Sequence, residues 1–305
     1  MKHFLKKILL FLVPITLLLL SGLFLPPTPR AAGSFLFSEK RKDSLLQYTA
    51  EPRLIFVGGS NLSFGLNSAE IKDSLHLNPV NTGVNVGIGI KYMLENTLQF
   101  VKRSDTVIII PEYEIYYHPY DVAFDELLRT IFDVSPNKIK FLSFKQGVNL
   151  VEYIPKFSLT KFDPSEYVGF KESDVYSVNS YNNFGDVDAH WNLARRTYVA
   201  TSIDGNFNET IVKKIKEFET AASNKGAVVY LSFPCLDEAS FNISREKVLK
   251  VEKVLQQHHF KLLGNAQRYV LPSEMMFNTK YHPNKAGLEL RTKLFMEDFR
   301  SARNK

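Results

Sequence analysis

The sequence predicts an α/β fold in which a parallel sheet is flanked by helices. Two observations predict this class: short unbroken apolar runs, and helix-like stretches that alternate with them. Strands buried on both faces read as continuous apolar runs, because helices cover each side of a parallel sheet. The chain has 305 residues, of which 45% are apolar and 23% charged, so it is too apolar for a disordered protein.

The expected elements follow one another along the chain from Arg53. The first strand ends at the glycine pair 58–59, the next helix opens at Asn67 and Ser68, and the helix near residue 220 stops at an Asn-Lys-Gly sequence. We expect strands over residues 53–57, 80–86, 106–110, 227–232 and 260–263. We expect helices over residues 68–75, 92–102, 209–223, 245–258 and 284–300.

The alternation stops after Pro111 for about eighty residues that are rich in Tyr, Phe and Asn. We interpret residues 112–200 as an aromatic-rich insertion over the sheet. Residues 53–305 then form one α/β domain. Residues 26–50 mix prolines, small residues and charges, and we expect residues 34–52 to be a linker.

The amino terminus predicts a membrane segment. Residues 8–25 contain no charge, and 18 residues are long enough to cross most of a ~30 Å hydrocarbon core. Three lysines precede this run and one arginine follows, which places the amino terminus in the cytoplasm and the body outside. Residues 1–33 are therefore an anchor or a signal segment, and the small residues Ala31-Ala32-Gly33 leave cleavage open.

The charge balance disfavours nucleic acid as a partner. Residues 1–33 contain four basic and no acidic side chains, so this segment carries most of the formal net charge of +6. The remaining body is nearly neutral and has no strongly basic balance for a phosphate backbone. The single cysteine, Cys235, excludes an intrachain disulfide and a multi-cysteine metal site. Glycines 83, 87 and 89 do not match a dinucleotide fingerprint, and we expect neither a nucleotide cofactor nor a metal.

Candidate catalytic residues follow the strands, because ligands of parallel sheets bind at the carboxyl ends of the strands. Ser60 follows the first strand, Gly87 follows the second, and His282 directly precedes the last helix. A serine is a weak nucleophile until a base takes its proton, and histidine is suited to that role at neutral pH. We therefore expect Ser60 and His282 to pair, although a plain turn and a helix cap explain the same residues.

Two other groups of residues have alternative interpretations. Asp186, Asp188 and His190 are a possible cation site, but a surface turn with a packing role is the favoured interpretation. His118 and the tyrosines around it suit either a sugar site or an aromatic patch packed on the sheet.

Five blocks together resemble the SGNH (GDSL-type) hydrolase superfamily, and more narrowly its membrane-anchored subgroup in bacterial envelopes. They are residues 58–61 (GGSN), 85–87 (NVG), 111–114 (PEYE), 182–186 (NNFGD) and 278–292. The resemblance implies a flavodoxin-like sheet, with Ser60 as nucleophile and His282 as base. It also implies that the backbone N–H groups of Ser60 and Gly87 form the oxyanion hole, with no cofactor. The implied location is a bacterial inner or cytoplasmic membrane, crossed once.

The chain departs from the family pattern beside the histidine. The usual aspartate three residues before it is Thr279, and the position four residues before it is Asn278, a possible orienter of the ring. The family's oxyanion asparagine is also absent, and Glu112 and Tyr113 stand in that block. With Asn61, these two are candidates for substrate contact. Glu112 is equally well interpreted as a displaced acid or as a salt-bridged structural residue.

Two main functions remain open from the sequence, and a third, less favoured one is a peripheral membrane scaffold without a ligand pocket. The first is an esterase or O-acyltransferase that acts on an acylated glycan or polysaccharide of the cell envelope. The second is a catalytically silent scaffold that binds glycan or partners a membrane acyltransferase.

Overall fold

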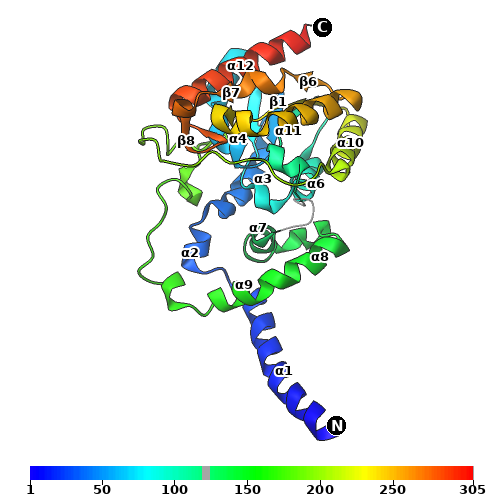
Figure 1. Cartoon of the computed structure of the whole chain (residues 1–305), viewed down its shortest axis with the longest axis vertical. Helices are drawn as coiled ribbons and strands as arrows, with labels where there is room; N and C mark the ends of the chain where they lie inside the picture. The colour runs from blue at the N-terminus through cyan, green and yellow to red at the C-terminus, as the bar shows by residue number, and fades with distance from the viewer. Residues whose placement is uncertain (119–123, 305) are drawn as a thin grey trace.

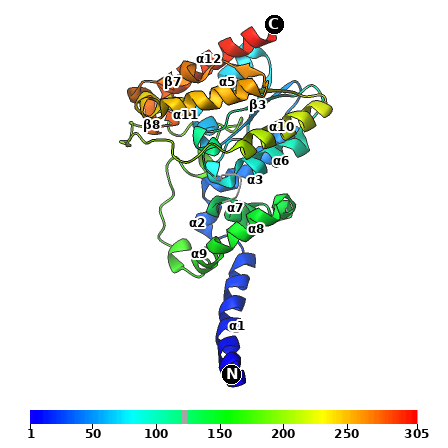
Figure 2. The same cartoon turned by 45° about the vertical axis from the view of Figure 1, so that its right-hand side comes forward.

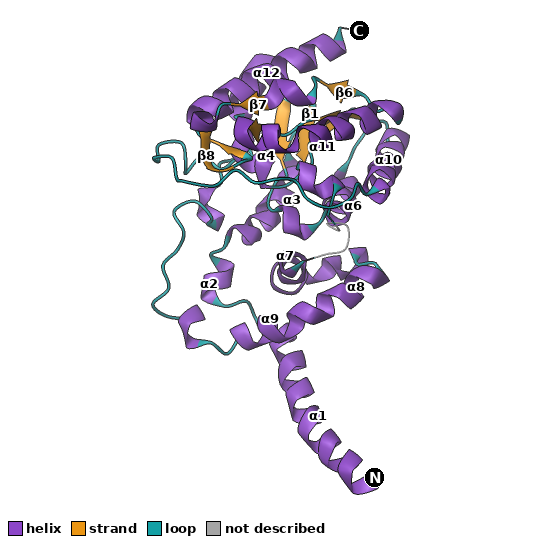
Figure 3. Cartoon of the chain, in the orientation of Figure 1, coloured by secondary structure: helices purple, strands orange, loops and turns teal. Residues whose placement is uncertain are grey.

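The computed structural model describes residues 1–118 and 124–304. Figure 1 shows a sheet domain at one end, a layer of short helices below it, and the long amino-terminal helix α1 (Lys2–Phe24) projecting away from both. Figure 3 shows that the strands are confined to the sheet domain.

The central sheet has five parallel strands in the order β2-β1-β3-β4-β6. This arrangement confirms the predicted α/β class with a parallel sheet. The strands are β1 (Arg53–Val57), β2 (Asn78–Asn81), β3 (Thr106–Ile109), β4 (Val228–Ser232) and β6 (Leu262–Leu263). Two small sheets pair β5 (Leu236–Asp237) with β7 (Val270–Leu271), and β8 (Met276–Thr279) with β9 (His282–Pro283).

Helices cover both faces of the sheet, which explains why β1, β3 and β4 are mostly apolar. Leu54 and Phe56 of β1 pack with helices α4 (Ser60–Gly65), α5 (Ser68–Leu75) and α12 (Lys285–Arg303). Ile55 and Val57 point to the opposite face, because side chains alternate along a strand. That face is covered by α3 (Ser38–Tyr48), α6 (Ile90–Phe100), α10 (Glu209–Asn224) and α11 (Glu238–Gln257).

Two of the expected elements begin and end at other residues than the sequence predicted. The second strand was expected at residues 80–86, but β2 covers Asn78–Asn81, at the edge of the sheet, where Pro79 is tolerated. Helix α11 begins seven residues earlier than expected, because Asp237 caps it by accepting a hydrogen bond from Ser240 N at 3.0 Å. Its backbone kinks at Ser244, so the expected start at residue 245 marks the second part of the helix.

The segment expected as a linker differs most from its prediction, because it forms the packed helix α3. Leu46 is fully buried, and Lys42 Nζ donates to the carbonyl oxygen of Gly185 at 2.8 Å. Burial lowers the pKa of Lys42 to about 7. The buried residues of α3 are largely polar and find their partners far along the chain, so the local composition of residues 34–52 concealed a core element.

The expected insertion lies between β3 and α10, and its described residues, 112–118 and 124–200, contain no strand of the main sheet. Its helices α7 (Asp125–Arg129), α8 (Phe144–Leu150) and α9 (Ile154–Thr160) form the layer between the sheet domain and α1, as Figures 1 and 2 both show. The short helix α2 (Pro29–Ala32) connects α1 to the body. In the described part of the chain, one helix, at the amino terminus, is long and apolar enough to cross a membrane.

Candidate active site

Ser60 stands at a tight turn between β1 and α4. A Cβ atom on Gly58 would lie 2.5 Å from the carbonyl oxygen of Ile110, so glycine is needed where the chain leaves β1. Ser60 is the first residue of α4, and its side chain remains partly exposed at the carboxyl end of the strand. This is the location that the sequence predicts for a ligand-facing serine.

The structure brings Ser60 and His282 together across 222 positions of the chain. The Ser60 hydroxyl lies 2.9 Å from His282 Nε2, which is hydrogen-bonding distance. His282 belongs to β9, and its ring stacks on Phe64 with a centroid separation of 4.0 Å and an interplanar angle of 6°. The stacking fixes the plane of the imidazole beside the serine.

Asn278 contacts the other ring nitrogen, as the sequence analysis anticipated for an orienter. Its Oδ1 lies 3.0 Å from His282 Nδ1, while its Nδ2 donates to the Tyr176 hydroxyl at 2.8 Å. An amide that donates to Tyr176 presents its oxygen to the ring, so Nδ1 bears the proton. Nε2 is then the acceptor for the Ser60 hydroxyl, the arrangement that a general base requires.

The environment keeps His282 neutral. Burial lowers the pKa of His282 to about 3, and the nearby His190 contributes further in the same direction. In the described part of the chain, the ring contacts Ser60, Asn278, Tyr176 and aromatic rings, and none of these groups is a carboxylate. The ring is thus neutral above about pH 3 and able to accept a proton. The groups in direct contact with it are all neutral, so none of them would balance the charge of the imidazolium that forms.

Glu112 occupies the position beside the serine at the end of β3. Its Oε1 accepts a hydrogen bond from the Asn61 backbone N–H at 3.2 Å and lies 3.4 Å from the Ser60 hydroxyl oxygen. Burial raises the pKa of Glu112 to about 7, and the negative charge of Glu114 adds to the rise. Glu112 therefore changes between acid and carboxylate near neutral pH, within reach of the nucleophile.

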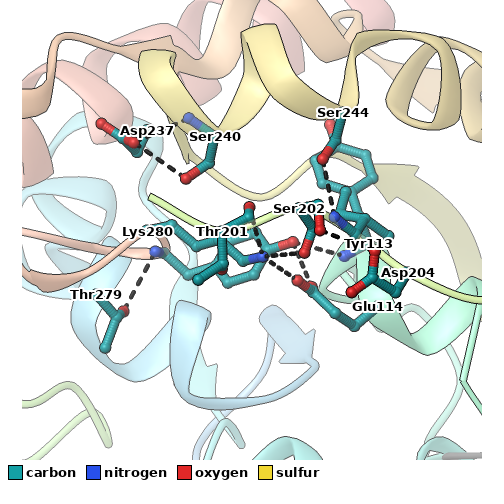
Figure 4. Close-up of polar contacts among 12 residues, drawn as sticks. Tyr113, Glu114, Thr201, Ser202, Asp204, Asp237, Ser240, Ser244, Thr279 and Lys280 are labelled. Atoms are coloured by element: carbon teal, nitrogen blue, oxygen red, sulfur yellow. Dashed lines mark hydrogen bonds and ion pairs between the residues drawn. The ribbon is translucent and has the colours of Figure 1, made fainter. Parts of the chain in front are cut away.

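An open cleft of about 470 Å³ gives access to these residues. Figure 4 shows Lys280 at one wall, where its ammonium lies 2.5 Å from a Glu114 carboxylate oxygen and donates to the carbonyl oxygens of Thr201 and Ser202 at 3.3 Å. These contacts hold the irregular segment 192–208 along the cleft. The lining residues are Ser60, Glu112, Glu114, Tyr198, Val199, Thr201, Ser202, Asn278, Thr279, Lys280, Tyr281 and His282.

Three other residues that were expected at the site do not present a free group to the cleft. The Gly87 N–H donates to Asn85 Oδ1 at 2.7 Å, and a Cβ on Gly87 would lie 2.3 Å from Glu126, so this expected oxyanion donor is engaged and covered. The Asn61 side chain donates to the carbonyl oxygen of Ile110 at 3.0 Å and is buried. Tyr113 is also buried, and neither Asn61 nor Tyr113 lines the cleft.

The acidic block near residue 186 is a structural element of the core. Asp186 is fully buried and accepts hydrogen bonds from Ser68 N at 2.8 Å and from Asn81 Nδ2 at 2.8 Å. The expected surface location is therefore wrong for Asp186, but the carboxylate does have a packing role, because it joins the loop to α5 and β2. Within residues 1–118 and 124–304, no group of three or more His, Cys, Asp or Glu is placed to hold a metal ion.

The aromatic segment around His118 is also largely core. Tyr116 and Tyr117 are buried, and the Tyr117 hydroxyl donates to the carbonyl oxygen of Lys247 at 2.7 Å. The rest of the motif proposed as a sugar site, residues 119–121, lies outside the described residues. Cys235 is buried between the end of β4 and the start of β5.

Sequence reasoning missed Phe64 and Tyr176. Phe64 follows Ser60 by four residues, so the helical spacing alone places both on one face of α4. Tyr176 lies in the insertion, 106 positions from His282, and no local pattern signals its contact.

A comparison of the chain with protein-family models finds no matching model, and a comparison with curated proteins finds no match.

Proposed function

We propose that this protein is a membrane-anchored esterase or O-acyltransferase of the SGNH hydrolase type that acts on an acylated glycan of the bacterial envelope. The single observation that supports it is the Ser60 hydroxyl at 2.9 Å from His282 Nε2, with Asn278 at the opposite nitrogen. When the five strands of the central sheet are numbered 1 to 5 along the chain, so that β6 is the fifth, their order across the sheet is 2-1-3-4-5. That order is typical of flavodoxin-like folds, and it supports the family proposed.

The chemistry proceeds through an acyl-enzyme. His282 Nε2 removes the proton of Ser60 as the hydroxyl oxygen attacks the acyl carbonyl, and the same nitrogen then gives the proton to the departing sugar oxygen. A water molecule or a second sugar hydroxyl next attacks the acyl-serine, transferring its proton to His282, and Ser60 regains a proton on leaving. Water gives net hydrolysis, and a sugar hydroxyl gives net acyl transfer.

The developing oxyanion needs hydrogen-bond donors, and two groups of the site supply them in this proposal. One is the backbone N–H of Ser60, as the family resemblance implies. The other is Glu112 in its acid form, because it lies in the block where the family has an asparagine and because Gly87 is engaged elsewhere. A buried carboxylic acid that stays neutral near pH 7 is an established type of oxyanion donor.

The cleft suits part of an acylated glycan. A volume of about 470 Å³ accommodates an acyl group with one or two sugar rings, and the exposed Thr201 in its wall offers a hydroxyl group to a polar ligand. The lysines at positions 2, 6 and 7 in the first turns of α1 favour an extracytoplasmic location for the body, on the side of the membrane where an envelope glycan is found.

The second candidate is a catalytically silent scaffold that binds glycan or partners a membrane acyltransferase. The observation that favours it is the neutral Asn278 at His282 Nδ1, where a triad has a carboxylate. Loss of that carboxylate costs a related triad about 10⁴ in rate.

A fluorophosphonate probe distinguishes the two candidates, because it reacts covalently with an activated serine. The full chain in detergent is expected to take up the probe at Ser60, and the Ser60→Ala variant is expected to take up none. Ser202→Ala, which removes another hydroxyl of the same cleft, serves as the matched control and is expected to label like the unmodified chain. Absence of labelling in the folded, unmodified chain would favour the silent scaffold.

The two titrating groups predict a bell-shaped pH profile of kcat/KM for a p-nitrophenyl ester. His282 must be neutral, which holds above about pH 3, and Glu112 must be in its acid form, which holds below about pH 7. Activity is thus expected to fall about tenfold per pH unit above pH 7. Glu112→Gln keeps a neutral donor and is expected to abolish this alkaline fall.

The control for this prediction is Glu114→Gln. It removes the negative neighbour that raises the pKa of Glu112, so the alkaline fall is expected to persist and to move to lower pH. An alkaline fall that survives unchanged in Glu112→Gln would exclude Glu112 as its cause.

A further inference from the structure

The insertion presents an apolar surface next to the membrane helix. Six large apolar side chains of residues 139–162 are between 47% and 90% exposed. We call them the lipid-facing platform: Ile139, Phe144, Val148, Val151, Leu159 and Phe162.

The platform has helical periodicity. Phe144, Val148 and Val151 follow one another at spacings of four and three residues, and so do Pro155, Leu159 and Phe162 in and just after α9. Residues at this spacing share one helix face. Leu150 in α8 and Phe157 in α9 are buried instead, so each helix has one apolar face packed inward and a second one left exposed.

Contacts between α9 and α1 fix the depth of the platform. The Ser158 hydroxyl donates to the carbonyl oxygen of Leu19 at 2.6 Å, and a Cβ on Gly22 would lie 2.5 Å from Ser158 Cβ. Phe24 of α1 also meets Phe132 of the insertion edge to face, with ring centroids 6.1 Å apart. Figures 1 and 2 show α9 directly at the end of α1, between that helix and the sheet domain.

The length of the apolar run then determines where α9 lies. Residues 8–25 extend for about 27 Å at the α-helical rise, so the whole run is needed to cross a hydrocarbon core of about 30 Å. Leu19 is six residues from the outer end of the run, about 9 Å below it. Because Ser158 touches Leu19, helix α9 lies within the outer interface of the membrane and not above it.

The charges near the platform fit the same surface. Residues 136–162 contain five lysines and one acidic residue, Glu152. Two of the lysines are buried with carboxylate partners, and Lys140, Lys145 and Lys156 are exposed. Apolar side chains flanked by exposed lysines are typical of segments that lie in the interface of a membrane with anionic lipids.

From these observations we infer that the lipid-facing platform inserts into the outer leaflet beside α1 and contacts anionic lipid. The inference rests on the proposed membrane anchorage. Two contacts with the bilayer, one spanning and one interfacial, would fix the orientation of the sheet domain above the surface.

Depth-dependent fluorescence quenching tests the inference in the full chain. Single cysteines introduced as Phe144→Cys and Phe162→Cys receive an environment-sensitive fluorophore, since Cys235 is buried and does not compete. The labelled chains are reconstituted into vesicles of phosphatidylethanolamine and phosphatidylglycerol that contain an acyl-chain quencher. Both positions are expected to lose roughly half of their emission, as expected for side chains ~5–10 Å deep in the interface.

Two matched positions separate the possible outcomes. Leu12→Cys reports the span itself, and Ile243→Cys in α11, an apolar side chain that is 59% exposed on the sheet domain, reports non-specific adsorption. Quenching at position 12 without quenching at 144 and 162 would overturn the platform while leaving the anchor intact. Protection of 144 and 162 from both lipid and aqueous quenchers would assign the platform to a protein partner instead, and equal quenching at 243 would also overturn the inference. No quenching at position 12 would overturn the anchorage, and the platform with it.

Discussion

Asn278→Asp is expected to raise kcat/KM for ester hydrolysis by about 10²-fold or more, with an upper bound near 10⁴ from the loss that the reverse change causes in a related triad. The side chain at this position lies 3.0 Å from His282 Nδ1. A carboxylate there would accept the Nδ1–H bond and stabilise the imidazolium that forms when Ser60 loses its proton. The hydroxyl of Tyr176, 2.8 Å from the amide nitrogen of Asn278, is placed to donate to the new carboxylate.

The pH profile reports the same change independently of the rate. Burial lowers the pKa of His282 to about 3, and a negative charge at hydrogen-bonding distance is expected to raise it toward neutrality. The acid limb of kcat/KM then moves to higher pH, and the imidazole resonances measured by NMR titrate at the same higher value.

Thr279→Asp is the matched control, because it adds the same charge one residue later. Thr279 faces His282 across the β8–β9 ladder through its backbone, while its hydroxyl accepts a hydrogen bond from the Tyr281 backbone N–H at 3.2 Å and not from the imidazole. We expect kcat/KM for ester hydrolysis to rise in Asn278→Asp and to stay unchanged in Thr279→Asp. If folded Asn278→Asp is no faster than the unmodified chain, proton transfer to His282 does not limit the reaction.

The Ser60 and His282 pairing was predictable because it depends on topology more than on packing. A serine directly after β1 and a histidine directly before α12 both belong to the carboxyl edge of a parallel sheet, and the structure places them 2.9 Å apart. The strands were predictable for a similar reason, since burial on both faces leaves a continuous apolar run such as residues 53–57.

The groups around the pair were not predictable to the same degree. Sequence motifs suggested the Gly87 N–H as an oxyanion donor, but its engagement depends on Asn85 and on Glu126 from the insertion. The position of Glu112 between Ser60 and Asn61 depends on how β3 ends against β1. Such contacts depend on tertiary packing. A sequence motif indicates only which residues could make them.

Buried polar residues account for the error at the predicted linker. Helix α3 contains Glu39 and Lys42, which are buried, and such residues normally indicate an exposed segment. Lys138 of the insertion pairs with Glu39 at 3.0 Å, a contact between residues 99 positions apart. A charged side chain in the core is stable only with its partner in place, and composition does not show the partner.

The buried ion pair of Arg53 and Asp105 illustrates the same principle and gives the largest expected effect on stability. Both side chains are 0% exposed, and the guanidinium binds the carboxylate through two nitrogens. Arg53 also donates to the carbonyl oxygen of Leu46 in α3 and to that of Phe100 at the end of α6. One cation therefore joins the helix of the predicted linker to the strand that leads into Ser60.

Asp105→Asn is expected to lower the free energy of unfolding by about 3–5 kcal/mol, because it leaves the guanidinium buried without a counter-charge. The thermal midpoint of the full chain in detergent is expected to fall by about 6–20 °C for a domain of this size. Glu219→Gln is the matched control: it removes the partner of Lys216, which is 43% exposed, and is expected to cost less than about 0.5 kcal/mol. Equal losses in the two variants would mean that water reaches Arg53, and α3 would then be a loosely attached helix, as a linker would be.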